Sequence, residues 1–128
     1  MTKAVRVSVR LPPWIQGELK RLAAGERRSL SAVVRDLLDE ALRMRRCPGI
    51  GFVDGPTGRR PVLAGTGLEV WEVVKAYKDC GEDFEKLKET LDWLSPRQLR
   101  DALHYWRLYP DEIEEELKAR AAELYPHL

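Results

Sequence analysis

The sequence lacks several features that would point to particular functions. It contains no asparagine and only two cysteines, Cys47 and Cys80, in 128 residues. Two cysteines are too few for a dense disulfide framework or a cysteine-rich zinc site. No apolar run approaches the roughly 18 residues that a membrane helix needs, and the N-terminus has no signal-peptide core. We therefore expect a cytoplasmic protein with no membrane partner.

Histidine is also scarce, and the residues present do not indicate an enzyme. His104 and His127 are far apart and lack the spacing of metal ligands, and Cys80 has no histidine at a recognisable distance along the chain. No phosphate-cradling glycine loop and no paired-carboxylate motif stands out. We therefore expect a binding protein with no catalytic residue, metal or cofactor.

The net charge of +1 hides a strong asymmetry along the chain. Residues 1–46 hold eleven Lys or Arg against five Asp or Glu, a net charge of +6. Residues 47–128 hold eleven against sixteen, a net charge of −5. A basic segment suits a polyphosphate partner, whereas an acidic segment suggests a different one. The Cys47-Pro48-Gly49 break between them predicts two domains, 1–46 and 47–128.

Residues 4–11 alternate with period two, which predicts a half-buried strand. One face carries valine, and the other carries polar residues: Val5, Val7, Val9; Arg6, Ser8, Arg10. A lone strand cannot satisfy its backbone groups, and the residues that follow it are helical in pattern. The simplest partner is the same strand of a second copy, paired antiparallel about a two-fold axis.

Two helices should follow this strand. The first is expected over residues 14–24, with Gly25 as the residue that ends it. Ser29 is a plausible N-cap for the second, which runs to the basic residues 43–46. The second helix has a regular apolar ladder at 3–4 spacing. We expect a dimer core formed by the valine face of the strand together with Val33, Leu37 and Leu38.

The order of strand, helix and helix resembles the ribbon-helix-helix family of Arc, MetJ and CopG-like repressors. The resemblance is carried by VRVSVRLP, by GERRSLS at residues 25–31 and by the apolar ladder. It implies an intertwined homodimer that inserts a two-stranded ribbon into the major groove of double-stranded operator DNA. Arg6, Ser8 and Arg10 would then read base edges, and each bidentate Arg–guanine pair contributes about 1–3 kcal/mol of discrimination.

The same resemblance implies a phosphate site at the start of the second helix, where helix geometry favours anions. The matching stretch is Ser29, Leu30 and Ser31, with Arg27 and Arg28 placed to add positive charge. The alternative is that all these basic residues are ordinary solvated surface.

The C-terminal part predicts a small hairpin followed by helices. Short apolar runs at residues 50–53 and 61–64 flank a turn-rich segment, and Thr66, between Gly65 and Gly67, could cap the next helix. Helical segments are expected over residues 68–79, 83–91, 96–108 and 111–125, with Ser95 and Pro96 opening the third. The fold class is therefore mainly α.

Residues 48–116 are similar to the bacterial domain-of-unknown-function family numbered 433. The resemblance is carried by GRRPVLAGTGLEV at residues 58–70 and WLSPRQLRDAL at residues 93–103. The additional Arg59 and a longer hairpin tip depart from the family pattern. The resemblance implies a helix-turn-helix-like domain and a VapB-like antitoxin beside a PIN-domain ribonuclease.

Two surfaces of this half remain open to interpretation. One side of residues 96–108 could carry basic and polar side chains: Arg97, Gln98, Arg100, His104, Arg107. Acidic residues surround it, so we expect protein interaction there rather than DNA contact. In the last helix, Ile113, Leu117 and Ala121 form a stripe that could dock in a toxin groove, with Lys118 or Arg120 meeting the nuclease. The competing interpretation packs this helix on its own domain.

Together these features predict a sequence-specific DNA-binding homodimer. The favoured role is the antitoxin of a type II toxin–antitoxin module that represses its own operon and neutralises a PIN-type ribonuclease. A stand-alone repressor with a C-terminal effector or oligomerisation domain is one alternative. A protein-binding adaptor without specific DNA binding is the other.

Overall fold

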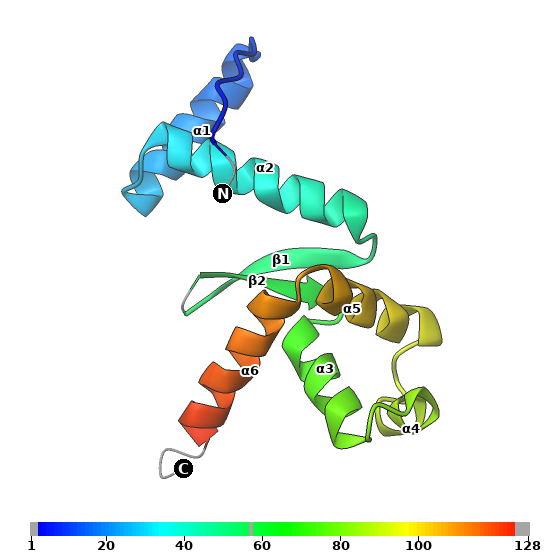
Figure 1. Ribbon diagram of the computed structural model, residues 1–128. Helices are drawn as coiled ribbons and strands as arrows, with labels where there is room; N and C mark the ends of the chain where they lie inside the picture. The colour runs from blue at the N-terminus through cyan, green and yellow to red at the C-terminus, as the bar shows by residue number, and fades with distance from the viewer. Residues whose placement is uncertain (1–2, 57, 125–128) are drawn as a thin grey trace. The chain divides into compact units, whose positions relative to one another are not determined.

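The computed structural model describes residues 3–56 and 58–124, which form six helices and one two-stranded hairpin (Figure 1). The predicted mainly helical class is confirmed. The elements are α1 (Pro13–Glu26), α2 (Leu30–Arg46), β1 (Ile50–Gly55), β2 (Gly58–Leu63), α3 (Val70–Asp79), α4 (Phe84–Thr90), α5 (Pro96–Leu108) and α6 (Pro110–Leu124). His127 and the predicted helix end at Tyr125 lie outside the described residues. Over the described ranges, no helix is both long and apolar enough to cross a bilayer.

The chain divides into two compact units, Met1–Ala41 and Leu42–Leu128, and each is described by itself. The division falls inside α2, whereas the sequence pattern placed a boundary after Arg46. The difference has a local cause, because the side chains of Arg43 and Cys47 pack within the second unit.

Helix α1 is longer than expected by one residue at its start and two at its end. It begins at Pro13, a residue whose fixed φ and missing N–H suit a first helical turn, and it continues through Gly25 to Glu26. Gly25 therefore does not end the helix, and the prediction was wrong. Arg27 adopts the left-handed conformation instead, with φ at 55°. The N–H of Arg28 donates to the carbonyl of Ala23 at 3.0 Å and closes the helix end.

The first unit has a very small core of its own. Leu19 and Ala23 of α1 bury against Val33 of α2, with Ile15 and Val34 partly buried around them. Ser29 caps α2 as predicted, because its hydroxyl accepts the N–H of Ala32 at 3.1 Å. Val33 was expected in a core shared by two chains. It is buried within the single chain, because α1 covers it.

Residues 3–12 form neither helix nor strand in the single chain. The strand expected over residues 4–11 is thus absent here. A strand is defined by its hydrogen bonds to a neighbour, and the prediction required the second copy as that neighbour. Pairing between two copies stays a prediction.

In the second unit, the end of α2 is followed by the predicted hairpin, which is longer than expected. Strands β1 and β2 pair antiparallel from Ile50 opposite Leu63 to Gly55 opposite Gly58. Gly55 is required at its position, since a Cβ there would lie 2.8 Å from the side chain of Arg60. The longer pairing brings Arg60 into a strand.

The chain leaves β2 through a tight turn that contains two left-handed glycines, Gly65 and Gly67, with φ of 80° and 72°. The Thr66 hydroxyl donates to the carbonyl of Leu63 and accepts the N–H of Leu68. Thr66 therefore fixes the turn and does not cap a helix, contrary to the expectation. Glu69 is the N-cap of α3 and forms a reciprocal capping box with Glu72.

Helices α3, α5 and α6 pack together, and α3 and α5 also cover the hairpin. The four buried side chains of α5 are Leu99, Ala102, Leu103 and Tyr105. They join buried residues of the hairpin, of helices α3, α4 and α6 and of two connecting segments in one core: Cys47, Ile50, Leu63, Val70, Val73, Val74, Leu87, Leu94, Ile113. The predicted start of α5 is confirmed, since Ser95 caps it and Pro96 is its first residue.

Candidate nucleic-acid interface

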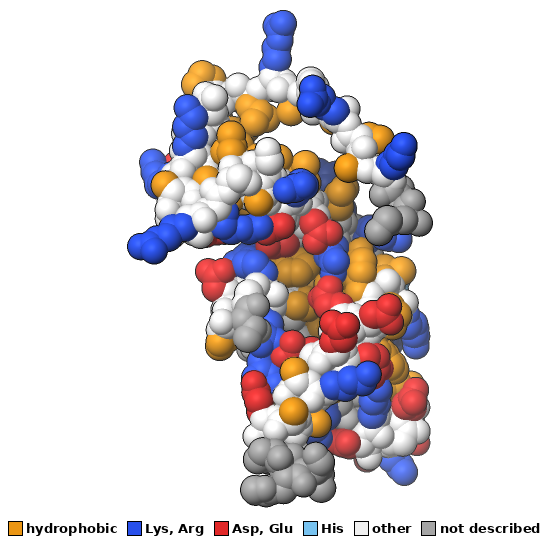
Figure 2. All heavy atoms as spheres, turned by 60° about the vertical axis from the view of Figure 1, so that its left-hand side comes forward, with side chains coloured by type: hydrophobic (Ala, Val, Ile, Leu, Met, Phe, Trp, Pro, Cys, Tyr) orange, Lys and Arg blue, Asp and Glu red, His pale blue; other side chains and the backbone are white. Residues whose placement is uncertain are grey.

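The N-terminal segment exposes both of its faces. The side chains of Val5, Val7 and Val9 are 82%, 77% and 70% exposed. Arg6, Ser8 and Arg10 are exposed as well, and no hydrogen bond or ion pair holds them within residues 3–56 and 58–124. Hydrophobic side chains accordingly lie open among Lys and Arg side chains over the first unit (Figure 2). Neighbouring apolar side chains that are this exposed often mark a site of interaction with another molecule.

An open groove of about 690 Å³ lies between the N-terminal segment and α2. Val5 and Val7 line one side, and Leu30, Val34 and Leu38 line the other. The apolar ladder of α2 continues beyond the small core of the first unit, with Leu37 and Leu38 exposed. The two apolar surfaces that the sequence assigned to a dimer core thus face a common space.

The start of α2 offers backbone donors at the surface. Ser29, Leu30 and Ser31 are all exposed. The N–H groups in the first turn of a helix have no intrahelical acceptor, and the side chain of Ser29 satisfies only that of Ala32. The amides of Leu30 and Ser31 therefore remain positioned for an anion.

The two arginines before this helix differ. Arg28 is held within the chain, where its guanidinium forms ion pairs with Asp36 and Glu26. The hydrogen bond to Asp36 raises the pKa of Arg28. Arg27 is exposed and has no partner among the described residues. Of the two predicted phosphate contacts, Arg27 is the one that needs no rearrangement.

The second unit contains a polar network that the sequence did not reveal. Arg43 donates to the hydroxyl of Tyr105 at 2.8 Å and pairs with Glu112, and Tyr105 donates to Glu112 at 2.7 Å. The guanidinium also stacks over the ring of Tyr109, 4.2 Å from its centroid. Burial lowers the pKa of Arg43, but these hydrogen bonds outweigh it and raise that pKa. Arg43 is therefore part of the fold and not of a basic surface.

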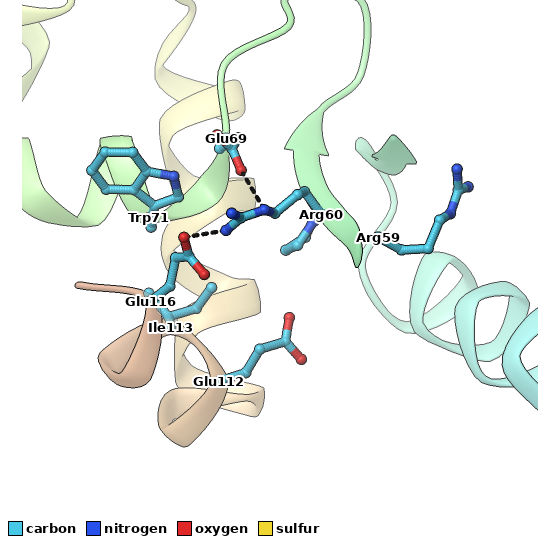
Figure 3. Close-up of a pocket in the computed structure, with 8 residues that line it drawn as sticks. Arg59, Arg60, Glu69, Trp71, Glu112, Ile113 and Glu116 are labelled. Atoms are coloured by element: carbon cyan, nitrogen blue, oxygen red, sulfur yellow. Dashed lines mark ion pairs between the residues drawn. The ribbon is translucent and has the colours of Figure 1, made fainter. Parts of the chain in front are cut away.

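Arg60 forms a second buried network (Figure 3). It is 8% exposed, and its guanidinium pairs with Glu69 at 3.5 Å and with Glu116. Arg120 donates to the same Glu116 at 2.9 Å. The adjoining pocket has a volume of about 80 Å³, room for a few waters and too little for a cofactor. No sequence signal marks this network, because its members come from β2, the turn before α3, and α6.

The structure corrects the interpretation of α6 as a toxin-binding helix. Ile113 is 1% exposed in the core of the second unit, and Leu117 packs against that core. Arg120 is paired with Glu116 and Glu123. Only Lys118 of the four predicted residues is exposed. Ile113 and Leu117 thus pack on their own domain, as the competing interpretation expected, whereas Ala121 of the stripe is exposed.

Comparison with models of known protein families, with curated proteins and with solved structures found no match to this chain. The structural class is therefore described from the chain itself: it is mainly helical and has one antiparallel hairpin in its described residues. Within residues 3–56 and 58–124, no three His, Cys, Asp or Glu side chains gather in a way that could hold a metal ion.

Proposed function

We propose that this chain is a homodimeric, sequence-specific DNA-binding regulator whose N-terminal segments pair across a two-fold axis. The observation that carries the proposal is the two-faced exposure of residues 4–11. One exposed face is apolar and the other carries Arg6, Ser8 and Arg10.

Pairing of two copies accounts for the apolar face. It supplies the hydrogen-bond partner that an isolated strand lacks. It also covers the valines and the exposed leucines of α2, Leu37 and Leu38. Each fully buried Val or Leu side chain contributes about 1.5–3 kcal/mol, so these residues together give a second copy a substantial driving force.

DNA contact accounts for the polar face. A two-stranded ribbon fits the major groove, where arginine binds guanine O6 and N7. In a pair of segments, four arginines and two serines would lie on one surface. The exposed amides of Leu30 and Ser31 and the unpaired guanidinium of Arg27 add sites for phosphate.

The antitoxin role rests on the resemblance of the second half alone, since the stripe of α6 that was to bind a toxin is buried. The geometry favours the regulator without choosing between an autorepressing antitoxin and a stand-alone repressor. A PIN-type nuclease gene directly beside this gene would favour the antitoxin.

The test is a binding titration of the full chain against the DNA upstream of its own gene and against a mixed-sequence duplex. Fluorescence anisotropy at several salt concentrations gives affinity and salt slope for each. We expect wild type to prefer the upstream DNA and to show a steep slope. Arg6→Ala/Arg10→Ala should abolish the preference, because each arginine contributes about 1–3 kcal/mol of base discrimination.

The matched control is Lys20→Ala/Arg21→Ala, which removes the same charge from the exposed surface of α1. It should retain the preference. Equal preference in wild type and Arg6→Ala/Arg10→Ala would contradict base reading by the N-terminal segment. Absence of any DNA binding by wild type would leave the adaptor alternative.

A further inference from the structure

Helix α5 of the second unit carries a basic stripe on its outer face. Arg97, Arg100, His104 and Arg107 follow one another at spacings of three, four and three residues, and all four are exposed. Residues at these spacings share one face of a helix. The opposite face is the buried one, formed by Leu99, Ala102, Leu103 and Tyr105. The stripe is therefore held on a packed helix with a capped N-terminus.

The three arginines of the stripe have no carboxylate partner within the described part of the chain. This distinguishes them from most basic residues of the second unit. Lys78 is paired with Glu114, Lys88 with Glu85, and Lys75 with Asp79. Arg100 lies over the ring of Phe84 instead, 5.9 Å from its centroid.

Two of the acidic residues that argued against DNA contact, Asp101 and Glu85, have neighbours of their own within the second unit. Asp101 is the one carboxylate in the sequence of α5. It faces Gly49, where a Cβ would lie 2.4 Å from its Oδ2. Glu85 of α4 is paired with Lys88. Four exposed carboxylates remain near the stripe in sequence: Asp83, Glu89, Asp92 and Asp111.

We propose that this stripe is a second DNA-contact surface, which binds phosphates of the duplex. The proposal rests on the proposed function, because it takes duplex DNA as the ligand. It reverses the expectation from sequence that this helix meets protein.

Geometry favours a duplex over an acidic protein. Ten residues of helix separate Arg97 from Arg107, a rise of about 15 Å, which compares with a major-groove width of about 12 Å. Guanidinium groups at the two ends can thus reach phosphates on both sides of a groove. Arginine binds phosphate through paired, planar N–H donors, and here the guanidinium groups are not committed to carboxylates.

The test uses the full chain and a long mixed-sequence DNA duplex, with affinity measured over a range of salt concentrations. The variant is Arg97→Gln/Arg107→Gln, and the control of equal charge change is Lys75→Gln/Lys118→Gln. Loss of two phosphate contacts per protomer lowers the salt slope by about 1.8 for each protomer that binds, and the affinity by up to about sixty-fold for each at roughly 0.1 M salt. The control should change the slope by much less.

The Arg6→Ala/Arg10→Ala variant is measured in parallel, and all variants are also titrated with the DNA upstream of the gene, so that the two proposals fail separately. If the stripe variant binds like its control while the Arg6/Arg10 variant loses sequence preference, the stripe proposal is wrong and the proposed function stands. If the stripe variant alone weakens binding, the stripe proposal stands and the N-terminal site is wrong. If wild type binds no duplex, both are wrong, and the stripe is left to a protein partner.

Discussion

The two units of this chain differ in how far their hydrophobic side chains are buried. Among the described residues, the second unit buries thirteen in one core, from Cys47 to Ile113. The described part of the first unit buries three, Leu19, Ala23 and Val33, and leaves the valines of its N-terminal segment exposed. The second unit forms a core within one chain, whereas the first leaves apolar surface that the proposed dimer would cover.

The difference extends to the charged residues. In the second unit, buried arginines are bound by carboxylates, as Arg60 is by Glu69 and Glu116. In the first unit, Arg6 and Arg10 lie exposed and without partners among the described residues. Charges that stabilise a fold are paired inside the chain, and charges free to bind a ligand are not. By this criterion the arginines on the outer face of α5 resemble those of the N-terminal segment, although α5 itself packs in the second unit.

The largest expected effect tests the core of the second unit. Leu99→Ala removes a fully buried side chain and should lower the free energy of unfolding by about 2–5 kcal/mol. Trp93→Ala removes a larger but 60% exposed side chain, and should change it by about 0.5 kcal/mol or less. Urea denaturation followed by fluorescence or circular dichroism measures both. Similar losses in the two variants would mean that the described core is wrong.

A smaller effect tests the paired charges of this unit. Burial raises the pKa of Glu116, but the ion pairs with Arg60 and Arg120 outweigh it and lower that pKa below its ordinary value of 4.5. A carboxyl whose pKa is lower in the folded state stabilises the protein above its unfolded pKa. That contribution is lost as the pH falls through the lower folded value.

We therefore expect Glu116→Gln to be less stable than wild type at pH 7 and equally stable at strongly acidic pH, where wild-type Glu116 is itself protonated. Unfolding free energies measured across the acidic range check this. The exposed Glu115→Gln serves as the control and should follow wild type throughout. A stability difference that persists unchanged in acid would exclude the ion pairs as its cause.

The smallest effect compares one capping residue in each unit. Ser29 and Ser95 each accept a backbone N–H at 3.1 Å, and replacing either by alanine costs about 1 kcal/mol. Ser95→Ala should lower stability equally at all protein concentrations. Ser29→Ala should act through the dimer, so its effect on the melting temperature should depend on concentration. Concentration dependence in both variants, or in neither, would remove the distinction between the units.

Local signals in the sequence predicted much of the fold. The Ser95-Pro96 pair fixed the start of α5, and Ser29 fixed the start of α2, because capping acts over three or four residues. The end of α1 was missed for the opposite reason. A glycine ordinarily takes the left-handed position after a helix, but here Arg27 does, and no local pattern favours it.

Alternation placed Arg6, Ser8 and Arg10 on one face of the N-terminal segment, and their reading of DNA stays a prediction; it did not show that the valines of the other face lie exposed in the single chain. Periodicity defines a face of a helix but not what covers it. The Ile113 and Leu117 stripe was therefore open to a toxin or to the protein's own core, and the fold settled it. The Arg60 and Arg43 networks join residues far apart in the sequence, which no local pattern can pair.

The central claim is that residues 4–11 become a paired strand only when two copies meet. Amide hydrogen exchange of residues 5–10, measured at rising protein concentration, tests it most directly. The account predicts amides that exchange freely in dilute protein and become protected as the dimer forms, while Leu38→Glu, which places a charge in the dimer core, stays unprotected. Free exchange in wild type at every concentration would contradict the account.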